Sequence, residues 1–540
     1  MWTAQEVTIM NNRPLKGIAC ILSGIIAFTL LLVNSSYNTQ NEQAVFAETI
    51  SAPKIEDSYI SGDVNSDGSF DIADLVLLQK WLLAVPDTDL ANWKAADLSR
   101  NERLDAFDLC LMKRALFAKD KKDGSELIPP PISAVSPTMP CVGEARVLMI
   151  AVSFPDAQHD FSAEEIQNMC FGPEDPQSLQ YPMESISAYY SRASYGRLNL
   201  TGKVYTYTAK YEINDYMKTN YREADYRTRD ELLEETLEAL DDVIDYNDYD
   251  VNKDGILDAV ILALPKEAIN RDSDKDGKED WVPCHCYYNG NAKYDGVKPV
   301  RMCIGARDLS TTAKFNSAWI HELGHAMGLP DYYRVITNNP HDQEGLIGQT
   351  GWEMMDDSWG DFSAFSKLMY GWFTGNELQI YTGGTQTYEL RSLQDAPNCV
   401  LIPRGDLNGF HSEYFIVEFN TPTGNDSAMV IGDNRIPLFR QGGVRVLHCN
   451  AELSEISSGK MFKWCINSKL YDRTNKKQRV LRGINYKNMY FNEGQVINNE
   501  TNDFAWYDEN GDRTVDPGIT ITISDFDENT GCKITIAPAI

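Results

Sequence analysis

Residues 317–331 read SAWIHELGHAMGLPD, and the most specific pattern in the chain lies within them. His321 and His325 are four residues apart, so on a helix they lie on one face, one turn apart. Both imidazoles can then reach one zinc ion, and Glu322 can act as general base toward a water on that ion. Ser317 is predicted as the N-cap of this helix.

The residues after the second histidine predict how the helix ends and where the chain goes next. Gly328 permits the left-handed conformation that ends a helix, and Pro330 prevents the helix from resuming. The chain then turns back and presents Asp331 as a third ligand. Three protein ligands with a fourth position left to water form the catalytic type of zinc site. Glu344 and Glu353 are the alternative third ligands, as in a glutamate-type zinc site.

The segment from His321 to Asp331 resembles the zinc motif of the immune inhibitor A family, secreted bacterial metallopeptidases related to the metzincins, with Asp in place of the third His. Other segments resemble this family in the same order along the chain: residues 185–190, 194–198, 351–355, 363–367, 371–372 and 413–418. The resemblance covers residue 147 to the C-terminus. It implies an α+β zincin-like catalytic domain, with Met355 of the Met-turn as an apolar floor under the metal.

Residues 61–118 contain an internal repeat with an offset of 34 residues. In each copy an acidic twelve-residue loop leads into an amphipathic helix, as in calcium-binding loops. The first loop predicts these oxygen ligands: Asp63, Asn65, Asp67, Ser69 and Asp74. The second loop predicts these: Asp97, Ser99, Asn101 and Asp108. Glu102 stands where the second loop needs glycine, so weaker calcium binding is expected there.

This double motif resembles a dockerin module of cellulosomal enzymes, which implies the cohesin domain of a scaffold protein as partner. Lys80 and Arg114, at equivalent positions of the two helices, are candidate docking contacts. The alternative is a single EF-hand-like loop without a docking role. Two units in register, each with Asp at its twelfth position, favour the dockerin.

The remaining regions are assigned from composition. Residues 1–47 read as a signal peptide with cleavage after Ala47, and an uncleaved membrane anchor is the alternative. The domains are expected in this order: dockerin 58–118, Pro-rich linker 119–142, catalytic domain 143–380 and β-rich C-terminal domain 381–540. Strands are predicted at 146–153, 198–207 and 259–264, and a helix at 227–245. Short alternating runs beyond residue 372 predict the β-rich domain.

A further acidic loop precedes the strand predicted at 259–264. Its spacing is calcium-like, and its candidate ligands are Asp250, Asn252, Asp254 and Asp258. A solvated acidic hairpin is the alternative. Residues 272–280 form a second, weaker candidate. Outside the N-terminal apolar run there are ten cysteines, which permits disulfides but does not give their pairing. The sequence at 284–286, Cys-His-Cys, is predicted as a loop rather than a metal site.

The charge balance narrows the classes of function. Asp and Glu number 79 against 49 Lys and Arg, a net charge of −30, which argues against nucleic-acid binding, where a basic footprint is expected. Together the patterns predict a secreted zinc endopeptidase that acts on a protein or peptide substrate and attaches to a cellulosome scaffold. The alternative is a non-catalytic cellulosomal adhesion or binding component with a decayed protease fold. The intact Glu322 argues against such decay.

Overall fold

The computed structural model describes these residues: 62–86, 88–97, 103–104, 108–109, 112, 138–216, 226–268, 285–286, 288, 290–306, 312–332, 353–356, 359–407, 409–431, 436–437, 439–456, 459–465, 478–484 and 489–539. Several predicted features lie outside them: the signal peptide, most of the linker, Ser99, Asn101, Arg114, the loop at 272–280 and Glu344. Among the described residues, no helix is both long and apolar enough to cross a membrane.

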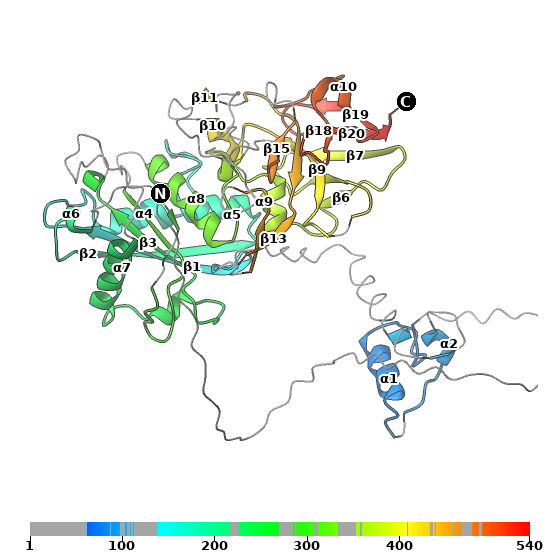
Figure 1. The fold of residues 1–540 in the computed structure, drawn as a ribbon, viewed down its shortest axis with the longest axis horizontal. Helices are drawn as coiled ribbons and strands as arrows, with labels where there is room; N and C mark the ends of the chain where they lie inside the picture. The colour runs from blue at the N-terminus through cyan, green and yellow to red at the C-terminus, as the bar shows by residue number, and fades with distance from the viewer. Residues whose placement is uncertain are drawn as a thin grey trace, which may run out of the picture.

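The N-terminal module has a small core of its own. Helix α1 (Ile72–Leu82) follows the first acidic loop, and α2 (Trp93–Ala96) precedes the second. Asp71 caps α1 and forms a capping box with Asp74. The apolar side chains that pack together come from both repeats: Val64, Phe70, Leu78, Ala96 and Met112. The two copies therefore fold as one unit (Figure 1).

The larger body is built on a five-stranded sheet in the order β2-β1-β3-β5-β4. Its strands are β1 (Gly143–Ser153), β2 (Leu198–Thr208), β3 (Ala259–Leu264), β4 (His285–Cys286) and β5 (Met302–Ala306). The first four strands in the sheet order are parallel, and β4 is antiparallel to β5 at one edge. The strands predicted at 146–153, 198–207 and 259–264 are confirmed. The loop predicted at 284–286 is wrong for its last two residues, because a two-residue edge strand has no periodicity to read.

Helices cover both faces of this sheet, so its central strands are buried on both sides. Alternate residues of β1 face the two cores: Val147 and Met149 pack with α4 (Ala163–Phe171), α5 (Ile186–Ala193) and α8 (Thr312–Ala326). Leu148 and Ile150 pack with α6 (Ile213–Tyr216) and α7 (Tyr226–Leu240). Helix α7 ends before the predicted residue 245, because two aspartates at 241–242 follow it and negative charge disfavours a helix C-terminus.

The C-terminal region is β-rich, as predicted. One sheet has the order β15-β12-β9-β8-β6 and another β16-β19-β20-β7. The elements are α9 (Ala364–Met369), β6 (Leu378–Ile380), β7 (Gln386–Arg391), β8 (Cys399–Pro403), β9 (Glu413–Asn420), β10 (Val430–Ile431), β11 (Ile436–Pro437), β12 (Gly443–Asn450), β13 (Leu453–Ile456), β14 (Gly459–Phe462), β15 (Leu481–Gly483), β16 (Val496–Ile497), α10 (Asn499–Asn502), β17 (Trp506–Tyr507), β18 (Arg513–Val515), β19 (Ile519–Asp527) and β20 (Gly531–Pro538).

Strand β9 joins this region to the rest of the body. Phe415 and Val417 enter the core between the two C-terminal sheets. Tyr414 and Ile416, on the opposite face of the strand, belong to the core that contains α8. The core under α8 therefore continues past residue 380, and the two predicted domains pack as one body.

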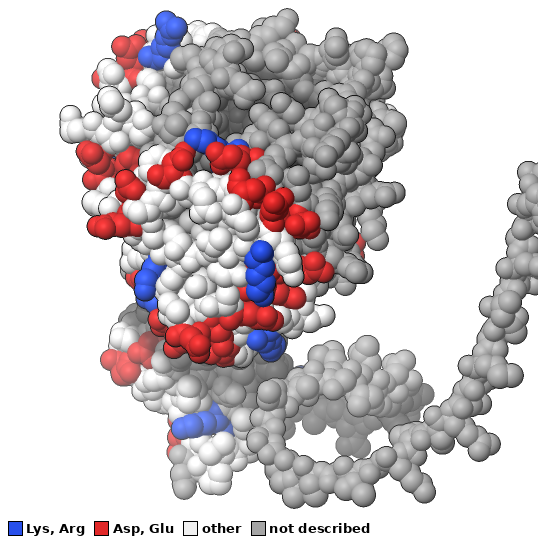
Figure 2. Space-filling view, turned by 90° about the vertical axis from the view of Figure 1, so that its left-hand side faces the viewer, with Lys and Arg blue, Asp and Glu red and all other residues white. Residues whose placement is uncertain are grey.

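Acidic side chains gather along the edges of the face shown in Figure 2, with few basic ones among them. This agrees with the net charge of −30.

Candidate metal centre

Helix α8 carries the two histidines and the glutamate of the motif. It begins at Thr312, so the N-cap predicted at Ser317 is wrong, and Ser317 lies within the helix. Residues 312–316 include neither proline nor glycine, which leaves nothing to stop the helix from starting earlier. Its inward face is fully buried at Trp319 and Leu323.

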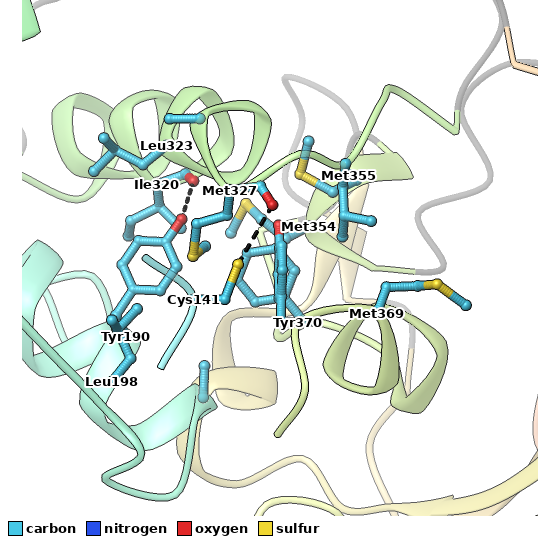
Figure 3. Packing of buried hydrophobic residues seen from close by; sticks show 14 of the residues in the cluster. Cys141, Tyr190, Leu198, Ile320, Leu323, Met327, Met354, Met355, Met369 and Tyr370 are labelled. Carbon is cyan, nitrogen blue, oxygen red and sulfur yellow. Dashed lines mark hydrogen bonds between the residues drawn. The ribbon is translucent and has the colours of Figure 1, made fainter. Parts of the chain in front are cut away.

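Three hydrogen bonds from neighbouring segments hold the underside and the end of α8. The hydroxyl of Tyr190, on α5, donates to the carbonyl of Ile320 at 2.6 Å, and the thiol of Cys141 donates to the carbonyl of Met327 at 3.5 Å (Figure 3). The N–H of Thr138 donates to the carbonyl of Ala326 at 3.0 Å. Residues 138–142, predicted as the end of the linker, thus pack against the end of α8 instead.

The turn after α8 has the predicted form. Gly328 has a left-handed φ of 104°, and its N–H donates to the carbonyl of His325 at 2.9 Å. The N–H of Leu329 donates to the carbonyl of Gly324 at 3.2 Å. The chain then doubles back and returns Asp331 to the exposed side of the two histidines.

The predicted ligand set is brought together by this turn. Oδ1 of Asp331 lies 3.0 Å from Nε2 of His321 and 3.3 Å from Nε2 of His325. Ligands about 2.0–2.1 Å from a tetrahedral zinc are about 3.3–3.4 Å from one another, so both distances suit a shared ion. Among the described residues, this is the one group of three or more His, Cys, Asp or Glu side chains with ligand atoms within 4.8 Å of one another.

The other ring nitrogens determine which tautomers fit. Nδ1 of His321 lies 3.0 Å from the carbonyl of Met354, and Nδ1 of His325 lies 2.7 Å from the carbonyl of Leu329. A carbonyl only accepts, so each Nδ1 carries a hydrogen, and a neutral ring then presents a lone pair at Nε2. The lone pairs on the two Nε2 atoms and a carboxylate oxygen of Asp331 then face one point, as the ligands of a divalent cation do.

The electrostatics agree with a strong attraction at this point. Burial alone would raise the pKa of Asp331. When both rings are instead protonated on both nitrogens, the positive charge of His325 and hydrogen bonds from both histidines hold this pKa well below its usual range. Burial opposes charge on His321, yet its hydrogen bond with Asp331 raises the pKa of the imidazole. Glu322 is buried on the same helix, and its negative charge adds to the rise at His321.

Met355 lies beneath the helix as the sequence predicts. It is fully buried, and a Cβ built on Gly324 would lie 2.6 Å from its sulfur. Gly324 stands between the two histidines in the sequence, so the sulfur packs against the helix backbone at the level of the ligands. Met354 and Met355 lie side by side below α8 in Figure 3.

Glu353, an alternative third ligand, is engaged elsewhere. Its carboxylate is fully buried and accepts from the N–H groups of Met355 and Ser363 at 2.6 and 3.0 Å. It also accepts from the hydroxyl of Ser366. The assignment of Glu353 as a ligand is therefore wrong. The sequence reasoning missed its role as a support, although its place in the Met-turn segment was a signal.

The acidic loop before β3 repeats the hydrogen bonding of the first acidic loop of the N-terminal module. In each loop the first carboxylate accepts from the N–H groups of the fifth and sixth residues: Asp63 from Asp67 and Gly68 at 3.2 and 3.0 Å, Asp250 from Asp254 and Gly255 at 3.0 and 3.0 Å. The fourth residue of each loop, Ser66 or Lys253, has φ of 60°. The predicted ligands at the first, third and fifth positions of the two loops therefore have matching backbone surroundings.

The second acidic loop of the N-terminal module is described only at its ends. Asp97 follows α2, and Asp108 is fully buried near Met112 of the module core. The predicted ligands Ser99 and Asn101 lie outside the described residues.

Comparisons with known proteins support the N-terminal assignment. The family model for the dockerin type I domain matches residues 61–117, so this part of the chain is a dockerin domain, and dockerin domains bind calcium and the cohesin of a scaffold. No curated protein gives a significant match. The resemblance of the body to the immune inhibitor A family stays a prediction.

Two crystal structures of wild-type OgpA from Akkermansia muciniphila are structural neighbours of the chain. One is 10% identical and covers 64% of this chain and 99% of its own, with a TM-score of 0.24. The other is 11% identical and covers 64% of this chain and 96% of its own, with a TM-score of 0.23. A likeness at these TM-scores carries no argument about the body.

Proposed function

We propose that this chain is a secreted zinc-dependent endopeptidase of the immune inhibitor A type, attached to a cellulosome scaffold through its dockerin. One observation carries the catalytic part of the proposal. His321, His325 and Asp331 converge within ligand distance of one another, next to Glu322 on the same helix. The three ligands are each partly exposed, and three protein ligands that leave a fourth position for water suit a catalytic zinc rather than a structural one.

The chain's own residues then take distinct roles. When bound, a zinc ion would polarise the scissile carbonyl and lower the pKa of a water molecule toward about 7. Glu322 accepts the proton of the attacking water and delivers it to the leaving amine. The carbonyls of Met354 and Leu329 hold the two imidazoles in the tautomer that presents Nε2. Met355 closes the site from below and excludes water there.

We also propose calcium binding by the loop at Asp250, Asn252, Asp254 and Asp258. The equivalence of its backbone geometry to the first dockerin loop supports this assignment. The loop leads into β3, which is the middle strand of the main sheet. Calcium there would fix the start of that strand.

The test of the function compares the wild type with Glu322→Gln. We expect the variant to keep one zinc per chain while cleavage of casein falls by about 10²–10⁴-fold, because general-base catalysis contributes on that order. Glu413→Gln is the matched control: Glu413 is a partly buried glutamate, and its partners, Arg404, His448 and Tyr507, all lie outside the metal centre. It should leave cleavage unchanged.

Two results would contradict the proposal. If Glu322→Gln cleaved casein at the wild-type rate, Glu322 could not be the general base. A wild-type chain that binds its cohesin but neither holds zinc nor cleaves any protein would favour the non-catalytic binding component instead.

A further inference from the structure

The turn at residues 353–356 contacts both segments that supply the proposed ligands. The carbonyl of Met354 accepts from Nδ1 of His321 at 3.0 Å. The carbonyl of Met355 accepts at 2.8 Å from the N–H of Tyr332, the residue directly after Asp331. A shift of this turn would therefore rotate the first imidazole and move the backbone beside the carboxylate ligand.

The carboxylate of Glu353 holds this turn in place. Oε1 accepts from the N–H of Met355 at 2.6 Å, inside the turn itself. Oε2 accepts from the N–H and hydroxyl of Ser363 at 3.0 and 3.2 Å, at the start of α9. It also accepts from the hydroxyl of Ser366, on the same helix. Glu353 thus ties the turn to a helix whose side chains are fully buried.

The hydrogen bonds form a closed circuit. The hydroxyl of Ser366 lies 3.2 Å from that of Tyr332, and both groups are buried. Tyr332 returns to the turn through its N–H and the carbonyl of Met355. Glu353, the turn, the segment beside Asp331 and α9 therefore constrain one another.

The chemistry of this pocket calls for a carboxylate. Four donors face Glu353: two backbone N–H groups and two hydroxyls. An ionised carboxylate only accepts, so it can satisfy all four donors. Each of its oxygens faces one backbone N–H, so the NH₂ group of an amide would point at one of these fixed donors in either orientation. A buried donor left without its acceptor costs about 1–3 kcal/mol.

Resting on the metal centre proposed above, we propose that Glu353 is a positioning residue for that centre: it sets the Met354 and Met355 carbonyls, and through them the orientation of His321 and the position of Asp331. Partners in the outer shell of a metal site typically change affinity or activity by about 10–100-fold when they are replaced. Glu353 acts through the turn and does not touch the reacting atoms.

The experiment measures metal binding directly, by competition of the full chain with a chromophoric zinc chelator and by the visible spectrum of the cobalt(II)-substituted protein. In Glu353→Gln we expect zinc affinity to fall by about 10–100-fold and the cobalt spectrum to change, since ligand geometry is altered. Glu413→Gln, the same substitution at a partly buried, hydrogen-bonded glutamate away from the metal centre, should keep wild-type affinity and spectrum.

Ser366→Ala provides a milder variant that keeps the bond between Glu353 and Met355. It should lower zinc affinity less than Glu353→Gln does. If Glu353→Gln does not fold, the zinc affinity of Ser366→Ala tests the inference in its place. A folded Glu353→Gln, or Ser366→Ala in its place, with wild-type zinc affinity and cobalt spectrum would overturn the inference. A wild-type chain that binds no zinc would instead contradict the proposed function, so the two failures are distinguishable.

Discussion

Asp258 closes the acidic loop of the body in the same way as Asp74 closes the first dockerin loop. Each is a fully buried carboxylate that accepts from the N–H of its loop's second residue: Asp74 from Val64 at 2.8 Å, Asp258 from Val251 at 3.3 Å. Asp74 arrives from the twelfth loop position on a helix, whereas Asp258 arrives from the ninth, just before β3. Two different elements thus close the same kind of loop.

Burial at this position predicts a pH-dependent stability that calcium should suppress. Burial raises the pKa of Asp258 from 3.8 to about 7, and Asp250 and Asp254 add to the rise. Between these values the folded chain holds a proton that the unfolded chain has lost, so stability falls as pH rises toward 7. With calcium removed by a chelator, the melting temperature of the body should be higher at pH 5 than at pH 8. Adding calcium should raise this melting temperature most at pH 8, where Asp258 is ionised.

The variant Asp258→Asn tests this assignment. It cannot ionise, so the melting temperature of its body should depend less on both pH and calcium, while the calcium response of the dockerin remains. Differential scanning calorimetry of the full chain resolves the two. A variant whose body keeps the wild-type calcium response at pH 8 would argue against the loop as a calcium site.

The sequence predicted the parts of the fold that have a local signal. Such a signal is present in the apolar segments that form β1 and β3 and in the glycine that ends α8. The structure contains both strands and the helix end. The spacing of His321, His325 and Asp331 also predicted which side chains meet. Strand β4 and the start of α8 were missed, because a two-residue strand and an uncapped helix start leave no pattern in the chain.

Features that depend on distant packing could not be read from the sequence. Glu353 meets Ser363 and Ser366, 10 and 13 residues away, only because α9 folds back over the turn. In the same way, Tyr190 reaches Ile320 across 130 residues through the packing of α5 against α8. Strand β9 is a third case: its alternation predicts two faces, but the sequence does not show that one face packs in the core that contains α8 and the other between the C-terminal sheets.

Asp331 should dominate metal affinity. In Asp331→Ala, two neutral imidazoles would remain without the carboxylate that lies 3.0 Å from one and 3.3 Å from the other. We expect zinc affinity to fall by more than the 10–100-fold typical of an outer-shell change, and cleavage to be lost. Chelator competition measures the affinity, with Glu322→Gln as the control that keeps zinc. Unchanged affinity would place the third ligand elsewhere.

The dockerin presents apolar side chains that should contact the cohesin. Ile72 is 68% and Val76 42% exposed, and both lie on the face of α1 that carries Lys80. Val76→Asp should weaken cohesin binding by tenfold or more, about 1.4 kcal/mol, and Lys80→Ala by less. Calorimetric titration with cohesin in calcium measures this.

Val243→Asp is the matched control for the docking prediction, since Val243 is 65% exposed but belongs to the body. Cohesin affinity should be unchanged in this variant. Equal affinity in Val76→Asp and the wild type would assign docking to another face of the module.

Gly324→Ala should reverse the usual effect of this substitution in a helix. Alanine in place of glycine normally stabilises a helix interior by about 1 kcal/mol. Here the new Cβ would lie 2.6 Å from the sulfur of Met355 and 3.1 Å from the hydroxyl of Tyr370, so the floor or the helix must shift. We expect a loss of about 1–3 kcal/mol in the free energy of unfolding, together with weaker zinc binding.

A double-mutant cycle separates this clash from other causes. Met355→Ala removes the sulfur, so Gly324→Ala should cost less in the Met355→Ala background than in the wild type, with a coupling of about 0.5–3 kcal/mol. Urea unfolding of the four proteins measures it. Additive effects, or a Gly324→Ala variant more stable than the wild type, would mean that Met355 does not lie against the metal-binding helix as described.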